Sequence, residues 1–176
     1  MKRISFLLLA VTTLAGVVAY AAYASGQSDG DSSPIYGVKI PSGYRDWKLI
    51  AVDHLLVAGK ADQLRAQLGN DIAIKAFKEG KVPFPDGSII AALHYGHIPS
   101  EENNKVFGDP QSFVPGPPTN VQFMVKDSKR YAATGGWGFA HFNKDGKPID
   151  AASMKTCFPC HSQIRARDLV FTRYAP

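Results

Sequence analysis

Residues 157–161 read Cys157-Phe158-Pro159-Cys160-His161, and this stretch carries more information about the chain than any other. Two thiols spaced three residues apart lie on the same edge of a helix, and the next residue adds an imidazole beside them. Cys-x-x-Cys-His is the sequence to which c-type haem is attached, with one thiol on each vinyl group. The sequence therefore predicts one covalently bound haem c, with His161 as the proximal ligand of its iron.

Other interpretations of the two cysteines remain open at this point. An oxidising compartment would allow a Cys157–Cys160 disulfide. Cys-x-Pro-Cys also occurs in thioredoxin-like dithiol enzymes, but only sixteen residues follow Cys160, too few to complete that fold. A zinc site would need further ligands, since the sequence has no second cysteine pair. A haem-free dithiol or disulfide redox protein is therefore the alternative to a cytochrome.

The N-terminal segment, residues 1–24, has the parts of a secretory signal peptide. Two basic residues open it, an apolar run covers residues 4–22, and Ala22-Tyr23-Ala24 has the small-x-small pattern of a cleavage site. We predict cleavage after Ala24 and export to a bacterial periplasm. An uncleaved anchor is the alternative, because the apolar run is long enough to span a bilayer.

The rest of the chain is long enough for one globular domain. Residues 25–33 are small and polar, which is typical of a flexible linker, so we expect the domain over residues 34–176. The formal net charge is +5, and Lys2 and Arg3 of the signal segment contribute two of these charges. Since the other basic residues form no stripe, we expect no nucleic-acid binding. No later stretch is apolar enough to span a bilayer, so we expect no membrane contact after signal cleavage.

Short strands and short helices follow one another without a regular βαβ order. We therefore predict an α+β domain, a mostly antiparallel β-sheet with a few short helices. Strands are expected over residues 47–57, 63–68, 88–96, 121–125, 137–142 and 169–174. Helices are expected from Asn70 or Asp71 to Gly80, over 127–133, and over 151–164 with an interruption at Pro159, whereas 99–120 is expected to be loop. Trp137, Phe139 and His141 alternate on one strand and are expected to belong to the core.

In order and spacing, these segments resemble the cytochrome P-460 family over about residues 36–176. The motifs that carry the resemblance are PSGYRDW (41–47), FPDG (84–87), VKDSKRYA (125–132), GWGF (136–139), Cys157–His161 and DLVFTRY (168–174). The resemblance implies a small, mostly antiparallel β domain, often a homodimer, with one c-type haem against the sheet.

The resemblance also indicates which chemistry to expect. Family members that oxidise hydroxylamine have a lysine bonded to the haem rim and a distal carboxylate that accepts protons. These positions correspond to Ala92 and Gln122 here, and the family's distal arginine corresponds to Arg65. Alanine cannot form the bond and glutamine cannot accept the proton at neutral pH. Relatives without the cross-link, the cytochromes c′-beta, bind nitric oxide or carbon monoxide at an open distal site.

The resemblance therefore implies gas-ligand binding or one-electron transfer, the latter with an unspecified redox partner. Oxidation of hydroxylamine or a related small nitrogen compound is the alternative. It would require another lysine at the haem rim, and the candidates are Lys75, Lys78, Lys81 and Lys105.

Two further sets of residues are candidates for the haem pocket. His94 shares a strand face with Ala92, because side chains alternate along a strand. It would close the site for electron transfer if it reached the iron, although a strand histidine is more often a hydrogen-bonded structural residue. Arg165 and Arg167 follow the cysteine motif and would either pair with the haem propionates or form a solvated basic turn.

Overall fold

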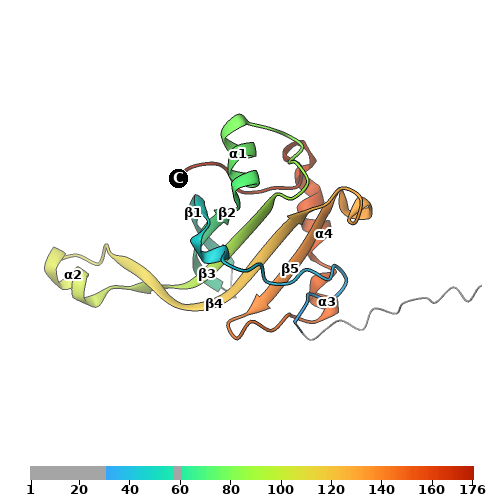
Figure 1. Ribbon diagram of the computed structural model, residues 1–176. Helices are drawn as coiled ribbons and strands as arrows, with labels where there is room; N and C mark the ends of the chain where they lie inside the picture. The colour runs from blue at the N-terminus through green and yellow to red at the C-terminus, as the bar shows by residue number, and fades with distance from the viewer. Residues whose placement is uncertain (1–30, 58–60) are drawn as a thin grey trace, which may run out of the picture.

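The computed structural model describes residues 31–57 and 61–176. The expected signal peptide and most of the expected linker lie outside the described residues. The described part of the chain forms one five-stranded antiparallel sheet in which each strand pairs with the next along the chain (Figure 1). The strands are β1 (Lys48–Val57), β2 (Ala61–Gly69), β3 (Ile89–Pro99), β4 (Phe113–Lys126) and β5 (Trp137–Asn143). The predicted α+β class is confirmed.

Short helices lie before, between and after the strands. They are η1 (Tyr44–Asp46), α1 (Asp71–Glu79), α2 (Glu101–Phe107), η2 (Ala132–Thr134), α3 (Ala151–Met154), α4 (Cys157–His161) and η3 (Ser162–Arg167). The ends of α1 are those that the sequence predicts. The Asn70 side chain accepts a hydrogen bond from the backbone N–H of Ala73, and Gly80 ends the helix at a φ of 60°. None of the described helices is long and apolar enough to cross a membrane.

Two apolar cores lie on opposite faces of the sheet. On one face, the N-terminal segment before β1 packs over Leu93, Val121 and Phe123. On the other face, α1, α4 and the C-terminal segment pack over β3 and β5, where Trp137 and Phe139 are buried (Figure 1). Successive side chains of a strand point to opposite faces of the sheet, so each strand contributes alternate residues to the two cores.

The packed region also includes part of the expected linker. Ser33 is buried, and its hydroxyl donates to the carbonyl oxygen of Phe139 at 3.0 Å. The packed domain therefore includes residues before 34, the boundary that composition predicts.

The expected loop over residues 99–120 is wrong. β3 and β4 continue past the body of the sheet as an arm that carries α2 at its tip (Figure 1). The Ser100 side chain caps α2, and the Asn104 side chain accepts from the backbone N–H groups of Gln111 and Ser112. The polar residues that suggested a loop therefore serve as helix caps and turn closures.

Two other elements differ from the prediction. The expected helix over residues 127–133 is replaced by turns up to Tyr131 and the short η2 from Ala132. Asp127 Oδ1 accepts from the N–H groups of Lys129 and Arg130 and stabilises an Asx turn instead of capping a helix. Residues 169–174 form no strand. The chain after this segment reaches β1, where the Ala175 N–H donates to the Ile50 carbonyl at 2.8 Å.

The helical region around the cysteines is interrupted, but not at Pro159. It consists of α3, α4 and η3, with Lys155 and Thr156 between the first two. Pro159 is the third residue of α4, where an intrahelical partner for its missing N–H is not needed.

Candidate functional site

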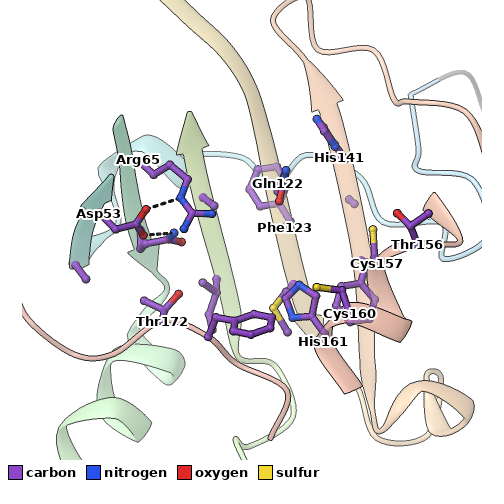
Figure 2. Close-up of a pocket in the computed structure, with 18 of the residues that line it drawn as sticks. Asp53, Arg65, Gln122, Phe123, His141, Thr156, Cys157, Cys160, His161 and Thr172 are labelled. Carbon is purple, nitrogen blue, oxygen red and sulfur yellow. Dashed lines mark hydrogen bonds and ion pairs between the residues drawn. The ribbon is translucent and has the colours of Figure 1, made fainter. Parts of the chain in front are cut away.

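The Cys157–His161 motif forms α4, which lies beside β5 on the face opposite the N-terminal segment (Figure 2). The preceding α3 is capped by Asp150, whose side chain accepts from the Ser153 N–H, and is anchored by the fully buried Met154. Both cysteines are free thiols, and both line one cavity. Burial raises the pKa of the Cys157 thiol, which favours its neutral form.

The orientation of His161 is fixed by the chain that follows α4. Its Nδ1 lies 2.7 Å from the carbonyl oxygen of Leu169. A carbonyl can only accept, so Nδ1 carries the hydrogen and Nε2 keeps a lone pair. Phe139 and Phe171 contact the imidazole, with ring centroids 4.9 and 5.1 Å away. Burial lowers the pKa of His161, so the ring is neutral near pH 7 and can act as a metal ligand.

A buried ion pair holds the Leu169 carbonyl in place. Asp168 and Leu169 both have left-handed backbone angles, with φ of 49° and 65°, so the chain reverses sharply after η3. The Asp168 carboxylate accepts from Lys126 Nζ at 2.8 and 2.9 Å and from the Phe84 N–H at 2.8 Å. These contacts hold the reversed segment against the sheet, beside His161.

The cavity beside α4 has a volume of about 820 Å³. Its second wall is the sheet itself, and one row of this wall crosses four strands. In that row Gln67 on β2 lies opposite Ala92 on β3, Ala92 lies opposite Gln122 on β4, and Gln122 lies opposite His141 on β5. All four residues line the cavity. Because Ala92 is small, this row leaves space at its centre.

A polar cluster lines the β1 and β2 end of the cavity. Asp53 lies opposite Arg65 in the sheet register, and Arg65 Nε donates to Asp53 Oδ1 at 2.5 Å (Figure 2). Gln67 Nε2 donates to the other carboxylate oxygen at 3.0 Å. The Asp53 carboxylate therefore fixes the position of the Arg65 guanidinium at this end of the cavity.

The structure gathers most of the residues that the sequence predicts. Cys157, Cys160, His161, Arg65, Ala92 and Gln122 all line the cavity. Sequence analysis missed Asp53 and placed His141 in the core, although His141 also lines the cavity, where burial lowers its pKa. Strand alternation carries a signal for Asp53, which shares a face with Ala51, but only the register shows that this face meets α4.

His94 is not among the residues that line the cavity. It is on the same face as Ala92 and one row further from α4, between Arg65 and Asn120 in the register. Its Nδ1 is hydrogen-bonded to Gln63 Oε1 at 2.8 Å. Burial lowers the pKa of His94 to about 4, and the charge of Arg65 contributes to this shift.

The other candidate cations lie elsewhere. Arg165 and Arg167 do not line the cavity, and Arg167 donates to the carbonyl oxygens of Phe171 and Thr172. Arg173 does line it. No lysine is found among the described residues of the cavity wall, so the side chains of Lys75, Lys78, Lys81 and Lys105 lie outside it.

The donor set and the size of this cavity fit a haem. Two free thiols one helical turn apart and a neutral imidazole face a largely apolar space of cofactor size. Comparison with protein families agrees with this chemistry, because the family model named cytochrome P460 matches residues 41–172. This chain belongs to the cytochrome P460 family. A search of the curated proteins finds no match.

Membership of the cytochrome P460 family implies that the chain is a haem protein. The resemblance noted in the sequence is thereby confirmed. The family as a whole does not distinguish gas binding, electron transfer and hydroxylamine oxidation, so the choice among them depends on the residues that line this cavity.

Proposed function

We propose that this chain is an exported c-type cytochrome that binds a small diatomic ligand, nitric oxide or carbon monoxide. Cys157 and Cys160 attach the haem and His161 is its proximal ligand. The sheet wall then faces the ligand. The observation that carries this proposal is the row Gln67–Ala92–Gln122–His141, which has a small side chain at its centre and lies across the cavity from α4.

Cys157–His161 form one side of the cavity, the α4 wall, and these residues would hold the cofactor. When bound, the haem supplies an iron with a coordination position for the diatomic ligand. The Leu169 carbonyl fixes the tautomer of His161, so Nε2 keeps its lone pair for the iron. Arg173 lines the cavity and is the arginine best placed to pair with a carboxylate of the cofactor.

The residues of the sheet wall would leave space for the diatomic ligand and bind it. The small side chain of Ala92 leaves space on this wall, and the amide of Gln122 beside it supplies a hydrogen-bond donor. The Asp53 carboxylate of this wall is not a free base, because it already accepts from Arg65 and Gln67, and Gln122 stands at the position of the family's distal carboxylate. Binding without proton removal fits these groups better than oxidation of hydroxylamine does.

One observation supports one-electron transfer as a second candidate function. Met124 lines the cavity from β4, and a methionine thioether is a known axial ligand of haem iron in cytochromes. His94, the residue that the sequence suggests for this role, is outside the cavity and hydrogen-bonded to Gln63. A closed site would therefore involve Met124 rather than His94.

The proposal is tested by the rate at which nitric oxide binds to the ferrous holoprotein. Ala92→Phe fills the space on the sheet wall and should slow association by at least about tenfold, since a packed wall must move to admit the ligand. Ala132→Phe adds the same ring at an exposed position on η2, outside the cavity, and should leave the rate unchanged. Equal rates in all three proteins would contradict ligand binding against this wall.

Export is tested by cell fractionation. Expression of the full chain should place the haem protein in the periplasmic fraction, with Ser25 as its first residue. A cytoplasmic protein with an intact N-terminus would contradict the signal peptide.

A further inference from the structure

Three potential metal ligands meet on three neighbouring strands, away from the cavity. His54 is on β1, Asp62 on β2 and His97 on β3, and one ligand atom of each lies within 4.8 Å of the other two. His54 Nε2 is 2.5 Å from Asp62 Oδ1, and His97 Nδ1 is 3.0 Å from the same oxygen. The two imidazole rings lie side by side, with centroids 4.5 Å apart.

The sheet register explains why these residues meet. Asp62 is opposite Leu56, two residues along β1 from His54, so the two side chains are diagonal neighbours on one face. Gln63 is opposite Gly96, which places Asp62 beside His97 on the next strand. Asp53 faces the haem cavity, so His54, the next residue, faces the other side. The cluster is therefore separated from the cavity by the sheet.

We propose that His54, Asp62 and His97 bind one divalent transition-metal ion of the zinc class. Two imidazoles and one carboxylate are a common set of protein ligands for Zn²⁺, with water at the remaining position. Neutral imidazoles also suit Cu²⁺ and Ni²⁺, and hard ions such as Mg²⁺ and Ca²⁺ prefer oxygen-only sites.

The separations of the donor atoms agree with a shared ion. Ligands about 2.1 Å from one metal ion lie about 3 to 3.4 Å apart when neighbouring, and no pair exceeds about 4.2 Å. The His97–Asp62 separation of 3.0 Å falls at the lower end of this range, and the His54–Asp62 separation of 2.5 Å is shorter, as expected for a hydrogen bond that a metal ion would replace. Small side-chain rotations would therefore suffice for coordination, without movement of the strands.

The surroundings of the cluster favour a site that is rigid on one side and open on the other. The side chain of His97 is only 15% exposed, and its ring stacks on Phe113 with centroids 4.1 Å apart. The side chains of His54 and Asp62 are about half exposed, which leaves an approach for the ion from solvent.

The test is calorimetric titration of the tag-free holoprotein with zinc chloride, after chelator treatment and dialysis. The wild type should bind one equivalent with a Kd in the micromolar range or below. Asp62→Asn and His97→Gln should each weaken binding by at least about tenfold, because each removes one of three ligands. Asp109→Asn makes the same change as Asp62→Asn at an exposed position on the arm and should bind zinc like the wild type.

A second readout separates loss of a ligand from loss of the fold. The haem absorption spectrum of each variant should match that of the wild type, since the cluster is on the other face of the sheet. Zinc should raise the Tm of the wild type and of Asp109→Asn, but not that of His97→Gln. The proposal is overturned if the wild type binds no zinc at millimolar concentration, or if the variants bind it as tightly as the wild type does.

Discussion

The two walls of the cavity that we propose for the haem are built in different ways. The α4 wall comes from five consecutive residues, Cys157–His161, and one carbonyl oxygen eight residues further along the chain. The sheet wall comes from Asp53, Arg65, Ala92, Gln122 and His141, each on a different strand. The first wall is suited to holding the cofactor, and the second to selecting what binds there. Under the proposed function, a change of ligand would need substitutions only on the sheet wall, while Cys157–His161 stay unchanged.

The two walls also differ in what fixes them. The sheet wall is fixed by ladder hydrogen bonds between strands, whereas the α4 wall depends on side chains. In particular, the buried contact between Lys126 and Asp168 joins the end of β4 to the segment whose carbonyl orients His161. We therefore expect the α4 wall to be more sensitive to single substitutions than the sheet wall.

The largest effect is expected from removal of the two thiols. The double variant Cys157→Ala, Cys160→Ala should carry no covalent haem, because no thioether can form. Intact mass under denaturing conditions measures this, and the wild type should show the mass of the chain plus one haem. Peptide mapping should find the haem on the Cys157–His161 peptide alone. A haem bonded also to a lysine peptide would contradict the account and revive hydroxylamine oxidation.

The next effect concerns the buried ion pair of the α4 wall. Asp168→Asn leaves Lys126, which is 5% exposed, with an uncompensated charge, and should lower the free energy of unfolding by about 3 to 5 kcal/mol. Asp145→Asn removes an exposed partner of Lys144 and should cost less than about 1 kcal/mol. Denaturant unfolding of the holoproteins compares the two. Equal costs would mean that the buried pair does not anchor this wall.

A pH effect is expected from the histidine just beyond the sheet wall. The pKa of His94 is about 4 in the folded protein and 6.5 in the reference state, so the unfolded chain binds more protons between these values. Stability should be fully present above pH 6.5 and should fall by roughly 3 kcal/mol as the pH drops to 4. His94→Gln cannot titrate and should lose less stability over that range. Parallel pH profiles of the two proteins would contradict a buried neutral His94.

The smallest effect is expected from the polar group of the sheet wall. Gln122→Leu removes one hydrogen-bond donor from the ligand's side of the cavity and should speed dissociation of nitric oxide roughly fivefold, as for a loss of about 1 kcal/mol. Ile149→Val changes an apolar residue of the cavity and should leave dissociation nearly unchanged. Stopped-flow displacement by carbon monoxide measures both. An unchanged rate in Gln122→Leu would show that the ligand is held without the amide.

The difference between the walls also explains what the sequence could predict. The sequence predicts the α4 wall because the chemistry of this wall depends on the local spacing of Cys157, Cys160 and His161. The two ends of α1 are predicted for the same reason, since helix caps are also local. Asp53 and His141 were missed because only strand register brings them to the cavity. The arm was mistaken for a loop, because the Asn and Ser side chains that close its turns have the composition of a loop. Asp127 suggested a helix cap but stabilises an Asx turn instead. An aspartate is common in both positions, so the residue type alone does not distinguish a helix cap from an Asx turn.

The absorption spectrum of the ferrous holoprotein tests directly whether the sheet wall leaves the haem open to a small ligand. Adding carbon monoxide should shift the spectrum of the wild type to that of a ligand-bound c-type haem. A sharp low-spin spectrum that does not change with carbon monoxide would contradict an open site. If Met124→Leu then restored the response, the closed site and one-electron transfer would be the correct account.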